Sequence, residues 1–197
     1  MNAGDAYITE GTYCTVDYCD FSNLSSKAVE ARDIIDSTYQ KIVDLLSPQY
    51  LYLRKISIKF VPEKIAYHQG KIEIDPAYLY PGNWGCLLHE ATHAVQSYPG
   101  VINRGHACWQ WMEGIADYCR IRLINDIQAK KGRPENGYAE AAHFLFWLNK
   151  VYGNDKVQKL NQLLYEKNDK LLTQDAIFFT LINESYRELL YEYIKSS

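Results

Sequence analysis

The residues best suited to chemistry in this sequence are the two histidines and the glutamate of an HExxH motif at residues 89–93. The surrounding stretch, 85–96, has no proline and no charged residue except Glu90, and it predicts a helix. Four residues correspond to about 400° of helical rotation, so His89 and His93 would share one face at roughly 6 Å. Two such imidazoles can bind one zinc ion, and Glu90 can take a proton from a water on that ion. The motif therefore predicts the zinc site of a hydrolase.

A catalytic zinc needs a third protein ligand, and a second motif downstream offers one. Glu113 and Asp117 lie four apart in another helix-like stretch, with nineteen residues between His93 and Glu113. Glu113 can bind the metal, while Asp117 on the same face can accept the N–H of a ligand histidine and so fix its orientation. Two alternatives stay open: HExxH can arise by chance, and two histidines on a buried helix can be ordinary core residues.

HExxH followed about twenty residues later by ExxxD resembles the gluzincin group of metallopeptidases. The closer resemblance is to the plant-type basic secretory protein family of peptidases, whose bacterial relatives share HExTHxxQ and a later EGIADYxR. Here these motifs stand as residues 89–96 and 113–120. Fainter similarities are Gly137-Tyr138 with 142–145, and the closing run 185–190. One departure is that the plant members are basic, whereas this chain has a formal net charge of -3.

The resemblance covers about residues 55–195 and implies a zincin-like metallopeptidase that acts on peptides or proteins. In gluzincin-like folds the strand before the metal helix is a sheet edge that lines the cleft, and an edge offers unpaired N–H and C=O groups to an extended peptide. The resemblance therefore implies a substrate-docking strand made of Lys71, Ile72, Glu73 and Ile74.

A peptide-bond hydrolase also needs a donor for the oxyanion that forms when water attacks the carbonyl. By the same resemblance, Tyr138 and His143 follow the metal helices at the chain position where gluzincins place that donor. The chain has 17 tyrosines, so packing is an alternative role for Tyr138. His68 and His106 are expected in loops.

Length and composition indicate a single domain over residues 1–197, since 47% of the residues are hydrophobic and a sizeable core is possible. The resemblance implies that this domain is zincin-like. The net charge does not indicate nucleic acid or a polybasic membrane partner. No apolar run approaches the roughly 18 residues of a transmembrane helix. The start lacks the basic and apolar regions of a signal peptide. The resemblance favours a trimmed mature form, secreted or periplasmic, and an intracellular protein is the alternative.

The five cysteines leave at least one thiol outside any intrachain disulfide. Cys86 and Cys119 lie in the two metal helices and are expected as small buried packing residues. Cys14 and Cys19 can form a bridge or stay free. A second zinc site made from these two would need partners that the sequence does not show.

The elements that position the motifs follow from periodicity and capping residues. Alternation predicts a short strand near 13–17, a strand over 55–61 and a hairpin over 65–74. Helices are expected from Asn23 or Ser25 to Leu46, then over 83–97, 109–129, 137–151, from 154 past 164, 175–182 and 185–194. Ser185 and Glu188 form a capping box for the last helix. The predicted fold class is α+β, with a small mixed sheet in the first half, a mostly helical second half and the active-site cleft between them.

The mechanism that these residues predict is metal-assisted hydrolysis of a peptide bond. Zinc would lower the pKa of a water toward about 7, and Glu90 would move its proton to the leaving amine. Two other classes stay open: a metal-binding module without turnover, and a zinc hydrolase of a non-peptide amide. An intact Glu90 argues against the first, because structural zinc has no use for a base. The oligomeric state is not indicated.

Overall fold

The computed structural model of the chain describes residues 7–48, 55–68, 70–80, 83–99, 105–167 and 173–196. Its internal contacts define two compact units, residues 1–44 with 50–97 and residues 45–49 with 98–197. The first unit holds a mixed five-stranded sheet, and the second is mostly helical. The predicted α+β class is therefore confirmed, while the single domain expected from the length stays a prediction.

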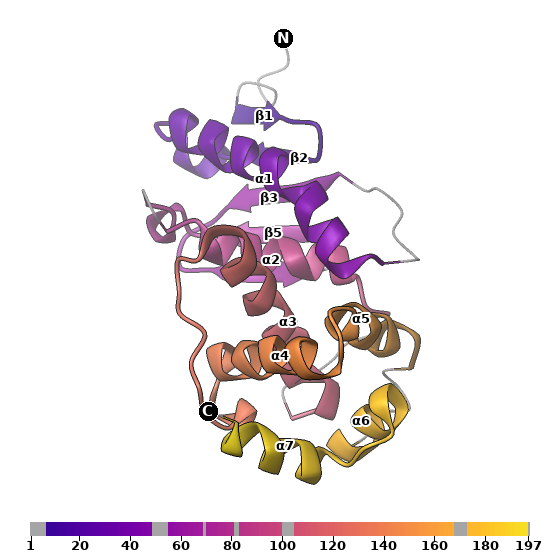
Figure 1. The fold of residues 1–197 in the computed structure, drawn as a ribbon. Helices are drawn as coiled ribbons and strands as arrows, with labels where there is room; N and C mark the ends of the chain where they lie inside the picture. Colours follow the sequence, from indigo (N-terminus) through magenta and orange to yellow (C-terminus); the bar gives the residue numbers. More distant parts are fainter. Residues whose placement is uncertain are drawn as a thin grey trace. The chain divides into compact units, whose positions relative to one another are not determined.

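The sheet of the first unit has the strand order β1-β2-β3-β5-β4 (Figure 1). The central strands β2, β3 and β5 are parallel neighbours, and β1 and β4 pair antiparallel at the two edges. The predicted strands and hairpin are confirmed, but β1 was not predicted because it is only three residues long. The bounds are β1 Ile8–Glu10, β2 Cys14–Asp17, β3 Ile56–Phe60, β4 Ile65–His68 and β5 Lys71–Ile74.

One face of the sheet is buried and the other is open. Ile58 and Ile72 are directly paired across β3 and β5, and both are fully buried. The next pair, Lys59 and Glu73, points to the opposite face and is only half-buried. Successive side chains in a strand alternate between faces, so this pattern requires the covering helices to lie on the isoleucine side.

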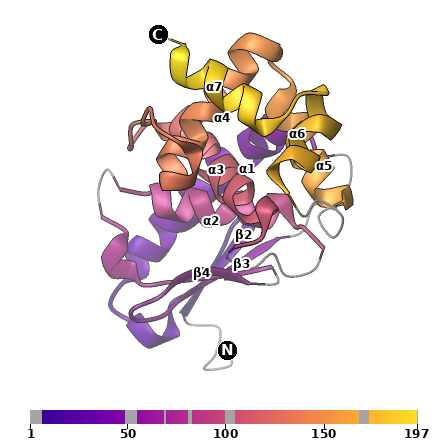
Figure 2. The ribbon, with the colours of Figure 1, turned by 90° about the horizontal axis from the view of Figure 1, so that it is seen from below.

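Two helices of the first unit, α1 (Ser25–Leu46) and α2 (Gly85–Gln96), cover that face (Figures 1 and 2). In α1 the fully buried residues recur at the three-to-four spacing that predicted the helix, for example Ala28, Ala31 and Ile35. The shorter helix α2 lies against β4 and β5. The predicted helices over 25–46 and 83–97 are therefore confirmed to within two residues.

The strand from Lys71 to Ile74 is not a sheet edge, and that part of the prediction was wrong. Ile72 pairs with Ile58 of β3 on one side and with Tyr67 of β4 on the other. The backbone of β5 pairs with β3 on one side and with β4 on the other, so β5 has no free edge to which a peptide could bind. The physical reason is burial: β5 carries two fully buried isoleucines, whereas Ile65 of β4 is 39% exposed. The strand whose two isoleucines are fully buried takes the inner position, and β4 is the edge.

The helices of the second unit surround a core of aromatic rings. The ring of Trp111 lies 5.0 Å from Phe178 and 5.3 Å from Phe144, centroid to centroid, and the indole is fully buried. Packing is therefore the role of Trp111. The bounds are α3 Ala107–Ile124, α4 Tyr138–Tyr152, α5 Lys156–Lys167, α6 Gln174–Ile182 and α7 Tyr186–Lys195.

The expected helices of the second unit are confirmed, and α3 differs most at its end. It stops at Ile124 rather than near 129, because Asn125 adopts the left-handed conformation and its N–H bonds to the carbonyl of Ile121. The capping box of Ser185 and Glu188 opens α7 as predicted. Among the described residues, no helix combines the length and apolar character needed to cross a membrane.

All five cysteines lie in the described part of the chain, and none of them forms a disulfide. The bridge between Cys14 and Cys19 that the sequence left open is not formed. Burial raises the pKa of the Cys14 thiol to about 12 and that of Cys108 to about 11. Cys119 is a buried packing residue as expected, and Cys86 is half-buried.

Candidate metal centre

The two histidines of the HExxH motif lie one turn apart on α2, and their Nε2 atoms are 3.1 Å from each other. Their rings are nearly perpendicular, at 84°, with centroids 4.8 Å apart. His89 is buried and His93 is half-buried. The helix therefore holds two ring nitrogens together, as the four-residue spacing predicted.

The helix that carries this pair is buried on most sides, because Leu87, Leu88 and Val95 are all fully buried. A helix in such surroundings has few polar side chains, and each buried polar group is expected to have a hydrogen-bond partner or a functional role. Thr92 satisfies its hydroxyl locally by donating to the carbonyl of Leu88 at 2.8 Å. The helix ends at Gln96, where Ser97 adopts a left-handed conformation and its N–H bonds to the carbonyl of His93.

Glu90 is the one acidic residue of α2, and it is 9% exposed. Among the residues that the structure describes, its carboxylate has no hydrogen-bond or ion-pair partner. Removing a carboxylate from water without a partner is unfavourable, so this position is not explained by stability. The carboxylate oxygens of Glu90 are therefore available to a ligand or a reacting group.

In the second unit, Glu113 and Asp117 lie one turn apart on α3 and are 8% and 5% exposed. Gly114, next to Glu113, allows α4 to approach closely, since a Cβ added there would lie 2.7 Å from the Cβ of Ala141. His106 precedes α3 as its N-cap, with its Nδ1 accepting a hydrogen bond from the backbone N–H of Cys108 at 3.1 Å. The helix that presents the two acids is thus held by a cap and by close packing.

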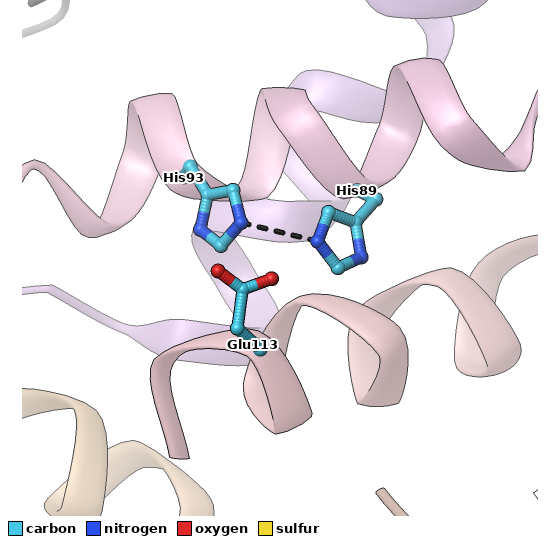
Figure 3. Close-up of side chains that lie close together, drawn as sticks. All are labelled: His89, His93 and Glu113. Atoms are coloured by element: carbon cyan, nitrogen blue, oxygen red, sulfur yellow. Dashed lines mark hydrogen bonds between the residues drawn. The ribbon is translucent and has the colours of Figure 1, made fainter. Parts of the chain in front are cut away.

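His89, His93 and Glu113 form one group of potential metal ligands (Figure 3). Each offers one ligand atom, and these atoms all lie within 4.8 Å of one another. Two imidazole nitrogens and one carboxylate oxygen are the protein donors of a common type of catalytic zinc site. The donor set therefore fits a divalent metal ion, and the group can bind one. The three predicted ligands are brought together, while zinc as their partner stays a prediction.

The remaining predicted site residues lie on α3 and α4. Asp117 is buried as its orienting role requires, but that role stays a prediction. The ring of Tyr138 packs edge-on against Trp109 at 5.5 Å between centroids. His143 makes a 2.8 Å hydrogen bond between its Nδ1 and the hydroxyl of Tyr193. Burial, with a smaller contribution from the charge of Lys131, lowers the pKa of His143. The oxyanion roles of Tyr138 and His143 stay predictions.

The structure adds one residue to which the sequence alone assigned no role. The side chain of Gln96 is 1% exposed, and its Oε1 lies 2.6 Å from Nδ1 of His93. The spacing of three residues in a helix was the available signal, because such residues are neighbours on the helix surface.

One comparison with known proteins covers the stretch of the chain in which these residues lie. A family model described as "Peptidase of plants and bacteria" (BSP) matches residues 63–193, which is more than half of the chain and includes both α2 and α3. No curated protein and no solved structure matches the chain.

Proposed function

Because the chain belongs to the BSP family of peptidases of plants and bacteria, we propose that it is a zinc-dependent peptide-bond hydrolase. The observation that carries the proposal is the group formed by His89, His93 and Glu113, whose ligand atoms lie within 4.8 Å of one another. Family membership supports peptidase activity, and the donor set supports a divalent metal ion as cofactor. Together they favour metal-assisted hydrolysis.

In this proposal the two imidazoles each supply an Nε2 lone pair, and Glu113 supplies a carboxylate oxygen. A zinc ion held there would supply Lewis acidity, polarising a peptide carbonyl and lowering the pKa of a water toward about 7. Asp117, buried one turn beyond Glu113, would accept the N–H of a ligand histidine and keep the ring in position.

Glu90 is the general base of the proposed reaction. It is adjacent in sequence to His89, and its carboxylate has no partner among the described residues. A carboxylate paired with a lysine or arginine would be a weaker base, because the cation stabilises the charged form. Glu90 can therefore take the proton of the attacking water and return it to the leaving nitrogen.

Two side chains on α4 remain the proposed donors to the oxyanion. The ring of Tyr138 packs on Trp109, which lies one turn before Glu113 on α3, so Tyr138 is near the part of that helix that carries Glu113. The lowered pKa of His143 favours a neutral imidazole, which can still donate one N–H. Removing a true oxyanion donor costs about 2.7–4 kcal/mol of transition-state stabilisation. Substituting Tyr138 and His143 one at a time should therefore show which of them is the donor.

The strand proposed to bind an extended peptide is β4, in place of β5. β4 pairs with β5 on one side and is the edge of the sheet. It also lies against α2, so a peptide added to this edge would run beside the helix that carries His89 and His93. Backbone hydrogen bonds to a sheet edge bind a peptide with little dependence on its sequence.

The test pairs metal analysis with a fluorogenic peptide library, on the wild type and on Glu90→Gln. Glutamine keeps the volume of Glu90 but cannot accept the proton, and loss of a general base lowers rates by about 10²–10⁴-fold. We expect one zinc in both proteins and cleavage by the wild type alone. The matched control is Glu30→Gln, the same change at an exposed position on α1, which should cleave normally.

Equal cleavage by the wild type and Glu90→Gln would contradict the mechanism. A wild type that binds zinc but cleaves no peptide in a diverse library would favour the metal-binding module instead.

A further inference from the structure

We propose that Gln96 is a positioning residue that selects the metal-binding tautomer of His93. The inference rests on the proposed function, because it takes His93 as a ligand. Its basis is the 2.6 Å contact between Oε1 of Gln96 and Nδ1 of His93. Gln96 is the last residue of α2, three positions after His93, and its side chain is 1% exposed.

The chemistry of this contact determines where the proton of the imidazole lies. A neutral histidine carries one proton, on Nδ1 or on Nε2, and an amide oxygen can only accept a hydrogen bond. Nδ1 of His93 must therefore be the donor, which leaves Nε2 unprotonated. Nε2 is the atom that faces Nε2 of His89 at 3.1 Å. Gln96 thus turns the lone pair of His93 toward the position that a metal ion would take.

The end of α2 is built to hold this pair in place. Burial removes rotamer freedom from the Gln96 side chain, so its Oε1 stays within hydrogen-bond distance of Nδ1 of His93. The left-handed Ser97 stops the helix directly after Gln96, and its N–H bonds to the carbonyl of His93 at 3.0 Å. The backbone and the ring of His93 are therefore both tied to the same helix terminus. Gln96 orients His93 from the same helix, α2, whereas Asp117, the other proposed orienting residue, lies on α3.

The first measurement is the tautomer of His93 in zinc-free protein, read from the ring nitrogen shifts by ¹⁵N NMR. The pH should be well above the ordinary histidine pKa of about 6.5, so that the ring is neutral. We expect the Nδ1–H form in the wild type and in Gln96→Glu, which still accepts. Gln96→Met removes the acceptor at similar length and should populate both forms. An Nε2–H form in the wild type, or an unchanged tautomer in Gln96→Met, would overturn the inference.

The second measurement is zinc affinity by competition with a chromophoric chelator. Loss of a hydrogen bond behind a ligand histidine weakens metal binding by about 10–100-fold, which is the loss expected for Gln96→Met. Gln96→Glu should bind zinc at least as tightly as the wild type. It also keeps the test decisive should the methionine variant fail to fold.

The matched control is Thr92→Val, which removes a buried polar group of the same helix together with its 2.8 Å bond to Leu88. This variant should lose thermal stability and keep its zinc affinity. A zinc affinity of Gln96→Met equal to that of the wild type would refute the inference and leave the proposed function intact. A wild type without zinc affinity would refute the proposed function and the metal role of Gln96, and the NMR measurement would still decide whether Gln96 sets the tautomer.

Discussion

The Nε2 atoms of His89 and His93 lie 3.1 Å apart across one turn of α2. Two nitrogens bound to a tetrahedral zinc at about 2.0–2.1 Å would be separated by about 3.3 Å. The helix therefore presents the pair within a few tenths of an ångström of the spacing that one ion requires. Little rearrangement of these two rings is needed on binding, so the affinity should depend mainly on the third ligand and on the groups that orient the rings.

Glu113→Ala should lose most of the bound zinc. Without this carboxylate only two protein ligands remain, whereas catalytic zinc sites use three. The measurement is zinc content after gel filtration, with Glu30→Ala on the exposed surface of α1 as the control. Wild-type zinc content in Glu113→Ala would show that the third ligand lies elsewhere.

Asp117→Ala should weaken zinc binding by about 10–100-fold while the domain stays folded. Asp117→Asn keeps an acceptor oxygen and should bind zinc with an intermediate affinity. The measurements are chelator competition for affinity and circular dichroism for folding. Asp117 is 5% exposed, so a purely structural role would appear as loss of helical signal even with excess zinc. That result would remove Asp117 from the site.

Gly114→Ala should destabilise the protein, although glycine to alanine inside a helix ordinarily stabilises it by about 0.5–1 kcal/mol. The added Cβ would lie 2.7 Å from the Cβ of Ala141, so α3 or α4 must shift. Overpacking of this kind costs about 1–3 kcal/mol in the free energy of unfolding, measured by urea denaturation. Adding Ala141→Gly should restore much of the loss. A more stable Gly114→Ala would mean that the two helices separate easily.

Asp75, just after β5, should contribute stability that depends on pH. Its carboxylate accepts hydrogen bonds from the backbone N–H groups of Ala77 at 2.7 Å and Glu63 at 2.6 Å. These bonds, that of Ala77 first, lower the pKa of Asp75 below its ordinary 3.8. The folded pKa is thus below the unfolded one, so the stabilisation is complete above about pH 4 and is lost as the pH falls through the folded pKa.

Asp75→Ala should therefore unfold more easily near neutral pH, by the roughly 0.5–2 kcal/mol typical of a lost cap, and this difference should shrink toward about pH 2. Thermal unfolding of both proteins across this range is the measurement. A difference that does not change with pH would mean that the charge of Asp75 has no part in the effect.

Features that depend on neighbours in the chain could be predicted from the sequence. The rotation per residue of a helix places His89 beside His93 and Glu113 beside Asp117 wherever those helices lie. The capping box of Ser185 and Glu188 is equally local, and the structure contains it. These relationships are set by backbone geometry within about one turn, so tertiary packing cannot change them without breaking the helix.

Other features were decided only by tertiary structure. Either strand of the hairpin could have been the edge of the sheet. In the folded protein β5, whose two isoleucines are fully buried, has the inner position, and β4 is the edge. The contact of Gly114 with Ala141 depends on how α3 packs against α4. The bond from Gln96 to His93 depends on the rotamer that burial imposes. Periodicity defines the face on which a side chain lies, but only packing of segments distant in the chain defines what that side chain meets.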